Sequence, residues 1–195
     1  MEKEIKMTRS RSRLNPKVRY LLKEWIEPIL LAVVLAVVIR TFFFQAFKIP
    51  TGSMRATLIE SDRVLVNKFL YRFKDPQRGD VIVFRYPVDG KKDFIKRLVG
   101  LPGETVEIRQ GKILINGKLV EETSKLRKNY YYNREDWDYG GENRQIKVPD
   151  NAYFVLGDNS AQSSDSRNWG FVPKKNLVGK AFMIYWPPKR VRMIE

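Results

Sequence analysis

Apolar residues form one continuous segment close to the N-terminus. Every residue from 29 to 39 is apolar, and after Arg40 and Thr41 the run resumes at Phe42. Eleven apolar residues fall short of the roughly 20 that a helix needs to cross a bilayer, but residues 28–47 supply twenty if Arg40 reaches the nearer interface. The pattern predicts an uncleaved transmembrane helix over residues 24–47, in preference to a buried core helix or a cleavable secretion signal.

The segment before this helix is strongly basic. Residues 1–23 carry eight basic and two acidic side chains with little apolar periodicity, which predicts a disordered tail. Basic residues flank membrane spans on the cytoplasmic side. The sequence therefore predicts a single-pass protein of the plasma membrane, with a cytoplasmic N-terminus and residues 48–195 forming one extracytoplasmic domain.

Beyond residue 48 the apolar residues fall into short runs that are rich in β-branched and aromatic side chains. The dipeptide Asn116-Gly117 between two such runs is among the strongest short signals for a β-hairpin. These runs predict an all-β domain with little helix beyond the anchor. The predicted strands are residues 63–70, 80–86, 94–99, 105–109, 112–115, 118–120, 153–156 and 178–186.

Residues 121–143 interrupt this β pattern with polar and aromatic side chains. A contact surface for a substrate or partner is one interpretation, and a solvated insertion or loop is the favoured one, because loops of this length vary freely. We assign the segment no role from its sequence.

The composition removes several kinds of catalytic site. The chain contains no histidine and no cysteine, which excludes a Ser-His-Asp triad, a cysteine nucleophile and a zinc site of imidazole or thiolate ligands. A serine nucleophile would need another base. Lysine is the realistic choice, because burial lowers its pKa towards neutrality, and a carboxylate pair is the remaining option.

The net charge of +15 raises the question of nucleic acid. Residues 1–47 contribute +5 and residues 48–195 contribute +10, and the second part mixes both signs without a nucleic-acid-binding motif. We therefore predict no nucleic-acid partner, and a surface that faces anionic lipid explains the charge equally well.

Three stretches carry candidate chemistry. Gly52 allows a tight turn that would expose the Ser53 hydroxyl, although these residues alone favour an ordinary turn. A strand over residues 94–99 would place Lys96 on one face with apolar neighbours, whereas a lysine reaching out from a sheet edge is the favoured interpretation of that stretch alone. Residues 157–167 form a loop dense in hydroxyls and carboxylates, in which Asp165 and Arg167 are close enough to pair.

Together these stretches resemble a bacterial type I signal peptidase, and the resemblance runs in order over most of residues 20–187. The motifs that carry it are IPTGSM (49–54), GDVIVF (79–84), IKRLVGLPG (95–103), GDN (157–159) and SDSR (164–167). The chain departs from the family pattern at Thr51, where many members have serine, and at Ser160, where the family often has arginine.

The resemblance implies a role for each matched residue. Ser53 would be the nucleophile and Lys96 the general base, and the Ser53 backbone N–H with the Thr51 hydroxyl would form the oxyanion hole. Ser163 would orient the Lys96 amine, and Asp165 and Arg167 would form a supporting pair. The remaining supporting residues would be Gly157, Asp158 and Asn159.

The resemblance also implies a mostly β catalytic domain with an antiparallel sheet or barrel-like fold. The reaction it implies is amide hydrolysis through an acyl-enzyme, with no metal and no cofactor. The substrates would be exported preproteins that carry signal peptides with small residues flanking the cleavage site. Membrane lipid is the second expected partner, and the protein translocation machinery is a further candidate.

A hypothesis from another class is a non-catalytic β module, tethered to the membrane, whose basic face binds lipid or an acidic partner. The tail, the anchor and the charge fit this module as well as they fit the enzyme. The lysine within an apolar strand and the ordered motifs favour the enzyme.

Overall fold

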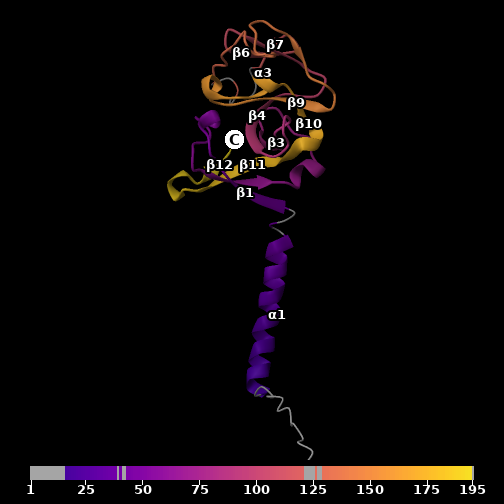
Figure 1. The fold of residues 1–195 in the computed structure, drawn as a ribbon. Coiled ribbons are helices and arrows are strands. Elements are labelled where there is room, and N and C mark those ends of the chain that lie inside the picture. Colours follow the sequence, from indigo (N-terminus) through magenta and orange to yellow (C-terminus); the bar gives the residue numbers. More distant parts are fainter. Residues whose placement is uncertain (1–15, 39, 41–42, 121–125, 127–128, 195) are drawn as a thin grey trace, which may run out of the picture. The chain divides into compact units, whose positions relative to one another are not determined.

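A computed structural model describes residues 16–38, 40, 43–120, 126 and 129–194. The chain divides into two compact units, residues 1–40 and residues 41–195. Of the disordered basic tail predicted over residues 1–23, residues 1–15 lie outside the described residues, and the prediction is wrong for residues 16–23, which form the first turns of a helix. In the first unit, helix α1 (Pro16–Val38) contains the apolar run and exposes its side chains, with Leu30 61% and Leu31 69% exposed (Figure 1). Among the described helices, none is both long enough and apolar enough to span a membrane.

The predicted C-terminal boundary of the membrane helix, residue 47, is wrong. Residues Phe44–Lys48 form strand β1, which pairs antiparallel with β2 (Arg63–Asn67). Strand alternation turns Phe47 towards a buried cluster around Val64 and Ile184. These aromatic residues continue the apolar run in the sequence, but they belong to the sheet.

The second unit is built on an eight-stranded antiparallel sheet in which the strand order is β1-β2-β11-β3-β4-β9-β10, with β12 paired to β11. Strand β11 lies between β2 and β3, and it also pairs with β12. The remaining strands of this sheet are β3 (Val81–Arg85), β4 (Asp93–Gly100), β9 (Ala152–Leu156), β10 (Val172–Pro173), β11 (Leu177–Trp186) and β12 (Arg192–Met193).

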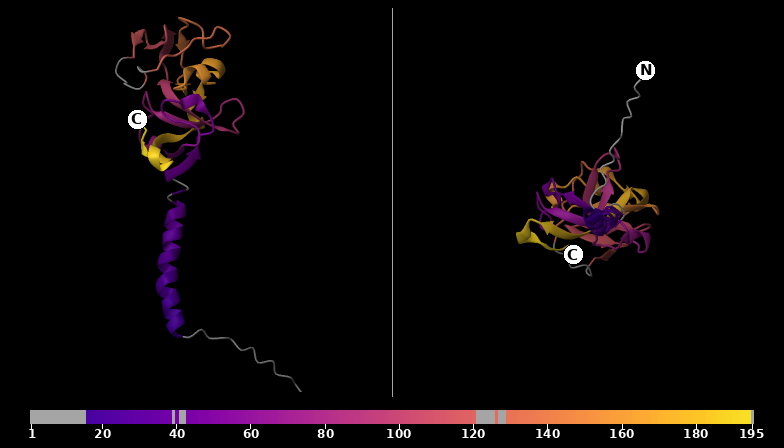
Figure 2. Two further views of the ribbon diagram at one scale, coloured as in Figure 1. Left: turned by 90° about the vertical axis from the view of Figure 1, so that its left-hand side faces the viewer. Right: turned by 90° about the horizontal axis from the view of Figure 1, so that it is seen from below.

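A four-stranded antiparallel sheet, in the order β7-β6-β5-β8, completes the unit. Its strands are β5 (Thr105–Arg109), β6 (Lys112–Ile115), β7 (Lys118–Leu119) and β8 (Ile146–Lys147). Gln110 and Gly111 join β5 to β6, and Asn116 and Gly117 join β6 to β7, and all four have positive φ, as two-residue hairpin turns require. The views in Figures 1 and 2 place this sheet at the end of the unit opposite β1 and β12.

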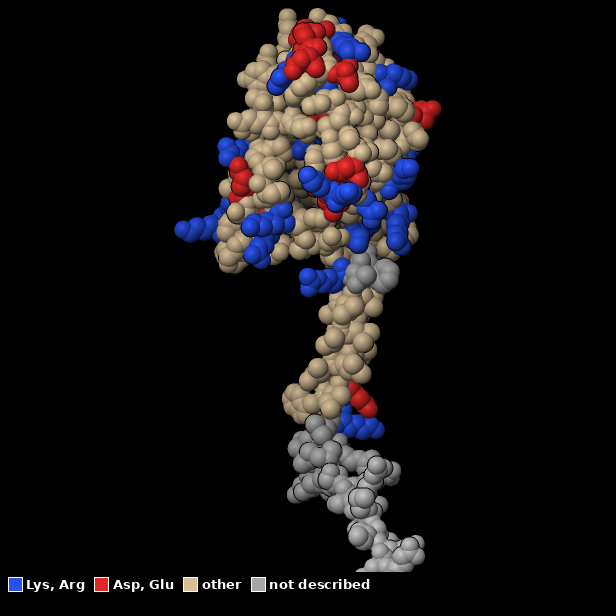
Figure 3. All heavy atoms as spheres, viewed as in Figure 1, with Lys and Arg blue, Asp and Glu red and all other residues tan. Residues whose placement is uncertain are grey.

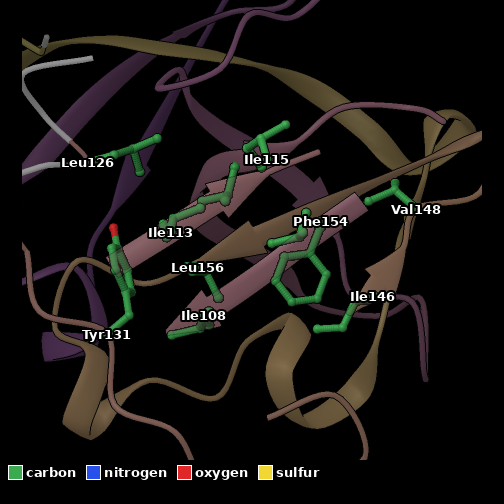
Figure 4. Packing of buried hydrophobic residues seen from close by; sticks show 11 residues of the cluster. Ile108, Ile113, Ile115, Leu126, Tyr131, Ile146, Val148, Phe154 and Leu156 are labelled. Carbon is green, nitrogen blue, oxygen red and sulfur yellow. The ribbon is translucent and has the colours of Figure 1, made fainter. Parts of the chain in front are cut away.

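Three buried clusters hold the second unit together. Figure 4 shows the one beneath the small sheet, where Ile108 and Ile113 pack with Phe154 and Leu156 of the large sheet. The other two clusters lie along the large sheet, one around Val64, Val66 and Ile184 and one around Ile82, Phe84 and Leu98. Strand β4 is fixed in the packed core, because Val99 belongs to the first cluster and Leu98 to the last.

The prediction of a mostly β, antiparallel domain is confirmed. Strands β5 and β6 match their predicted residues, and β2, β3, β4, β7, β9 and β11 match with shifted ends. Strands β1, β8, β10 and β12 were not predicted. Helical segments in this unit are short, namely η2 (Gly52–Met54), η3 (Leu70–Arg72), η4 (Ser160–Gln162), α3 (Ser166–Trp169), η5 (Lys174–Asn176) and η6 (Pro188–Arg190).

The segment predicted as a solvated insertion contributes to the core. Tyr131 is 1% exposed and Leu126 is 3% exposed, and both belong to the cluster beneath the small sheet (Figure 4). Residues 121–125 and 127–128 of this segment lie outside the described residues. For residues 129–143, the prediction of a merely solvated loop is too simple.

Candidate active site

The nucleophile candidate Ser53 lies in the short helix η2, directly after β1 and the Ile49-Pro50-Thr51 turn. Its side chain is 8% exposed, and the next residue, Met54, is fully buried and fixes the helix to the core. Asn159 binds this helix twice, because its Nδ2 donates to the Gly52 carbonyl and its backbone N–H donates to the Ser53 carbonyl, both at 3.0 Å. The backbone of the nucleophile is therefore held from the GDN loop.

Lys96 approaches Ser53 from the middle of β4. Its Nζ donates to Ser53 Oγ at 2.7 Å and to the Ile95 carbonyl at 3.1 Å. The side chain is 4% exposed, and Nζ lies 5.6 Å from the centre of the Phe94 ring. The interpretation of a strand that surrounds this lysine with apolar neighbours is therefore confirmed, and the lysine at a sheet edge, which the stretch alone favoured, is wrong.

Burial changes the protonation of Lys96. The loss of solvation lowers its pKa from the usual 10.5 to about 8, and the negative charges of Asp165 and Asp158 oppose this effect. Lys96 forms no salt bridge with any residue that the structure describes. A buried amine of this pKa can act as a base near neutral pH.

Thr51 shares a cavity with this pair. The cavity has a volume of about 640 Å³, and its lining is largely apolar around the reactive groups. Its walls are Pro50, Thr51, Ser53, Lys92, Asp93, Phe94, Ile95, Lys96, Gln162 and Ser164. Because Ser53 lies in the first turn of η2, its backbone N–H has no acceptor within that helix and is available to a ligand. Gln162 and Ser164 were not predicted as part of the site.

The residue that follows Lys96 forms a second buried centre. Arg97 is 2% exposed and binds Asp158 through two hydrogen bonds, Nε to Oδ1 at 2.8 Å and Nη2 to Oδ2 at 2.7 Å. Thr57 donates its hydroxyl to Asp158 Oδ2 and accepts from Arg97. Asp158 was predicted as a supporting residue, but its partner Arg97 was missed, because the sequence shows only a Lys-Arg pair in a strand.

Asp165 and Arg167 form the predicted ion pair, and both side chains are fully buried. Arg167 Nε donates to Asp165 Oδ1 at 2.9 Å and Nη2 donates to Oδ2 at 2.8 Å. Asp165 also accepts the backbone N–H of Gly157 at 3.0 Å. The pair therefore supports the strand end from which the GDN loop begins.

Ser160 and the aromatic segment complete this support. The Ser160 hydroxyl accepts from Arg167 Nη1 at 2.6 Å and from the Tyr132 backbone N–H at 2.8 Å. Trp137 lies between two guanidinium groups, with Arg167 5.0 Å and Arg134 4.8 Å from its ring. Where the family often has arginine, this chain thus uses Ser160 to connect residues 129–143 to the buried pair.

Ser163 is buried beside the site but makes no contact with Lys96. It is 3% exposed, and its Oγ has no hydrogen-bond partner among the described residues. A Cβ at Gly157 would collide with Ser163 Oγ and with the Ser53 carbonyl, so only glycine allows these groups to lie so close. The predicted orientation of the Lys96 amine by Ser163 is therefore not seen: the two hydrogen bonds of that amine go to Ser53 Oγ and the Ile95 carbonyl.

No group of three or more acidic side chains in the described part of the chain is arranged to hold a metal ion.

Comparisons with known proteins agree on one family. The family model described as signal peptidase, peptidase S26, matches residues 22–186. Signal peptidase I of Leptolyngbya laminosa is 44% identical over 185 residues, covering 91% of this chain and 86% of the relative. Probable signal peptidase I-2 of Synechocystis sp. is 42% identical over 179 residues, covering 87% and 77%. Signal peptidase I P of Bacillus subtilis subsp. natto is 38% identical over 170 residues, covering 87% and 91%.

Proposed function

The chain belongs to the signal peptidase family, peptidase S26, and on that premise we propose that Ser53 and Lys96 form the catalytic pair with which it removes signal peptides from preproteins. The activity follows from the family, whose members match the chain over most of its length. The assignment of roles rests on one observation, the 2.7 Å contact between Ser53 Oγ and a buried lysine amine of lowered pKa.

The protonation of Lys96 suits a general base. With a pKa of about 8, about a tenth of the molecules carry a neutral amine at pH 7, whereas an ordinary lysine would be neutral in fewer than about one in a thousand. In the neutral form Nζ accepts the Ser53 hydroxyl proton across the same contact. The fold thus supplies a base without histidine.

The reaction then proceeds through an acyl-enzyme. Ser53 Oγ bonds to the scissile carbonyl carbon while its proton passes to Lys96 Nζ. The Ser53 N–H and the Thr51 hydroxyl stabilise the oxyanion. When the amide C–N bond breaks, the leaving amine takes the proton from Lys96. Water, deprotonated by the neutral lysine, attacks the ester, and the proton returns to Ser53.

The supporting residues act through the backbone of the site. Asn159 holds Gly52 and Ser53, Asp158 fixes β4 through Arg97, and Asp165 with Arg167 fixes Gly157. The unpaired Ser163 hydroxyl, next to Ser53 across Gly157, is available to the Lys96 ammonium after proton transfer. Its role is to hold that amine in position during the reaction.

We further propose that α1 anchors the chain to the plasma membrane, with the catalytic unit on the extracytoplasmic side. The support is the exposed apolar surface of α1 and the basic residues that precede it in the sequence. Charged residues occupy the first half of α1, at Lys17, Arg19, Lys23, Glu24 and Glu27, so the apolar stretch begins at Pro28. Preproteins and membrane lipid are the partners of this arrangement, and the translocation machinery is a third candidate.

A cleavage assay tests the catalytic pair. The purified full chain should shorten a preprotein by its signal peptide, and Ser53→Ala and Lys96→Arg should both abolish this. Lys180→Arg is the matched control. Ile82 of β3 is the cross-strand partner of both lysines, with Lys96 on β4 at one edge of β3 and Lys180 on β11 at the other, and Lys180 forms an ion pair with Asp80. That control should keep its activity. An active Lys96→Arg variant would exclude Lys96 as the base, since arginine does not release its proton in a protein.

A further inference from the structure

A second cavity in the same unit has a volume of about 640 Å³, equal to that of the cavity at Ser53 and Lys96, which we call the substrate cavity. The substrate cavity is largely apolar, whereas the lining of the second cavity is mainly polar and basic. We call it the cationic cleft. Five basic side chains line it together with a single carboxylate, Asp93, which also lines the substrate cavity. The lining residues are Gln45, Lys68, Tyr71, Arg72, Arg85, Asp93, Lys174, Lys175, Asn176, Leu177 and Val178.

The cleft is assembled from segments far apart in the sequence. Short helix η5 supplies Lys174 and Lys175, the end of β3 supplies Arg85, and the segment around η3 supplies Arg72. Arg85 and Asp93 are cross-strand partners on β3 and β4. Because rigid strands and short helices fix these cations, their mutual repulsion persists in the folded protein.

Most of the charge in the cleft is not neutralised from within the described chain. Arg72, Arg85, Lys174 and Lys175 form no salt bridge with a described residue. Six other exposed or half-buried cations of the unit have carboxylate partners, namely Arg55, Arg78, Arg109, Arg134, Lys180 and Arg190, whereas single surface cations such as Lys112 and Arg144 form no salt bridge with a described residue. The cleft is distinguished by the fact that four cations without such a partner line one concavity. A concave site with such an excess of positive charge fits an anion that brings several acceptor oxygens.

The distribution of charge over the unit supports this reading. On the face shown in Figure 3, Lys and Arg side chains predominate over the half of the unit that carries β1, β11 and β12, with a few Asp and Glu side chains among them. Residues of β1 and β11 also line the cleft, namely Gln45, Leu177 and Val178.

The short distance along the chain from α1 to the cleft indicates that the anion belongs to a membrane lipid. Gln45 follows Val38, the last residue of α1, by only seven residues. Seven residues span at most about 25 Å, so a helix end at the membrane surface keeps Gln45 within reach of the headgroups. We propose that the cationic cleft binds the phosphate group of an anionic lipid headgroup, an inference that rests on the proposed anchoring by α1.

Photo-crosslinking in nanodiscs tests this site. The full chain is placed in phosphatidylcholine discs with increasing fractions of phosphatidylglycerol that carries a photoreactive group on its headgroup. Crosslinked peptides are mapped by mass spectrometry. The wild type should crosslink at peptides containing residues 68–72, 85 or 174–178, and the yield should saturate as the fraction rises.

Two matched double variants give the sharpest comparison. Lys174→Gln combined with Lys175→Gln should weaken the apparent affinity of the chain for the anionic lipid roughly 30-fold, because each lysine contributes about fivefold. Lys112→Gln with Lys118→Gln removes the same charge from the exposed side of the small sheet and should change it little. Equal loss in both pairs, or no loss in the first, would overturn the proposal in favour of a diffuse basic surface.

Two further arms separate the sources and the premises. Inorganic phosphate at millimolar concentration should not displace the lipid, whereas full displacement would assign the cleft to free phosphate and overturn the lipid source.

A lipid with a photoreactive acyl chain should label α1. Labelling of α1 without labelling of the cleft would overturn this proposal alone, and absence of both labels would also overturn the anchoring by α1.

Cleavage of a short soluble peptide by the Lys174→Gln, Lys175→Gln variant should equal that of the wild type, which keeps the test independent of the catalytic pair.

Discussion

Lys96 and Arg97 are neighbours on β4 with nearly the same burial, 4% and 2% exposed, yet the fold treats their charges in opposite ways. Arg97 donates two hydrogen bonds to the Asp158 carboxylate. Lys96 has a serine hydroxyl and a backbone carbonyl as partners, and no ion pair within the described residues. Strand alternation turns the two side chains to opposite faces of the sheet, so each has its own environment.

The difference follows from what each group can do with its proton. A guanidinium stays charged, so its burial requires a counter-charge, and removal of that charge is costly. An amine can respond to burial by losing its proton. The chain uses the first response to fix β4 against the GDN loop, and the second to create a base next to Ser53.

The largest expected effect is on catalysis by the unpaired lysine. Lys96→Arg should lower kcat/KM by about 10²- to 10⁴-fold, the usual contribution of a general base. The double variant with Ser53→Ala should be little worse than either single variant, because the two residues act as a unit. Single-turnover cleavage of a preprotein measures this, and additive losses would show that the two residues act in separate steps.

The next effect concerns the paired arginine. Asp158→Asn leaves the Arg97 guanidinium buried without a counter-charge and should lower the free energy of unfolding by about 3–5 kcal/mol. Urea unfolding of the soluble unit or of the chain in detergent measures the change. Asp136→Asn, at an exposed ion pair with Arg134, should change the free energy of unfolding little, because solvent screens that pair. Similar costs at the two positions would mean that Arg97 does not depend on Asp158.

Lys96→Met should act in the opposite direction and stabilise the protein below pH 8. The folded-state pKa of Lys96 is lowered from 10.5 to about 8, so the unfolded chain binds more protons between these values and wild-type stability rises with pH there. Below pH 8 the buried ammonium destabilises the wild type by about 3 kcal/mol, at about 1.4 kcal/mol per pKa unit. The gain from Lys96→Met should therefore be present at pH 6 and vanish above pH 10.5. A gain that is independent of pH would refute the burial explanation.

The smallest effect concerns a third buried cation, Arg167, which contacts both the Asp165 carboxylate and the Trp137 ring. Trp137→Leu removes the ring but leaves Asp165 in place, and should cost about 1–2 kcal/mol of unfolding free energy. A loss as large as that of Asp158→Asn would mean that Trp137, and not Asp165, carries most of the support for Arg167.

Local patterns predicted the fold better than the site. Alternation and turn residues were sufficient for β5, β6 and the Asn116-Gly117 hairpin, because these depend on neighbours in sequence. β1 was misassigned to the membrane helix, since its aromatic residues continue an apolar run and only its pairing with β2 distinguishes it. The Ser53–Lys96 and Arg97–Asp158 contacts join residues 43 and 61 positions apart, and the sequence offers no local signal for either. The family resemblance supplied the first contact and not the second.

The pKa of Lys96 tests the central claim most directly. NMR titration of ¹³Cε-labelled lysine in the full chain, with the Lys96 signal assigned by its loss in Lys96→Arg, measures it in the folded protein. The account predicts a midpoint near pH 8, well below the value of 10.5 for an ordinary lysine. A midpoint near 10.5 would show that Lys96 remains charged at neutral pH, and would contradict its role as the base.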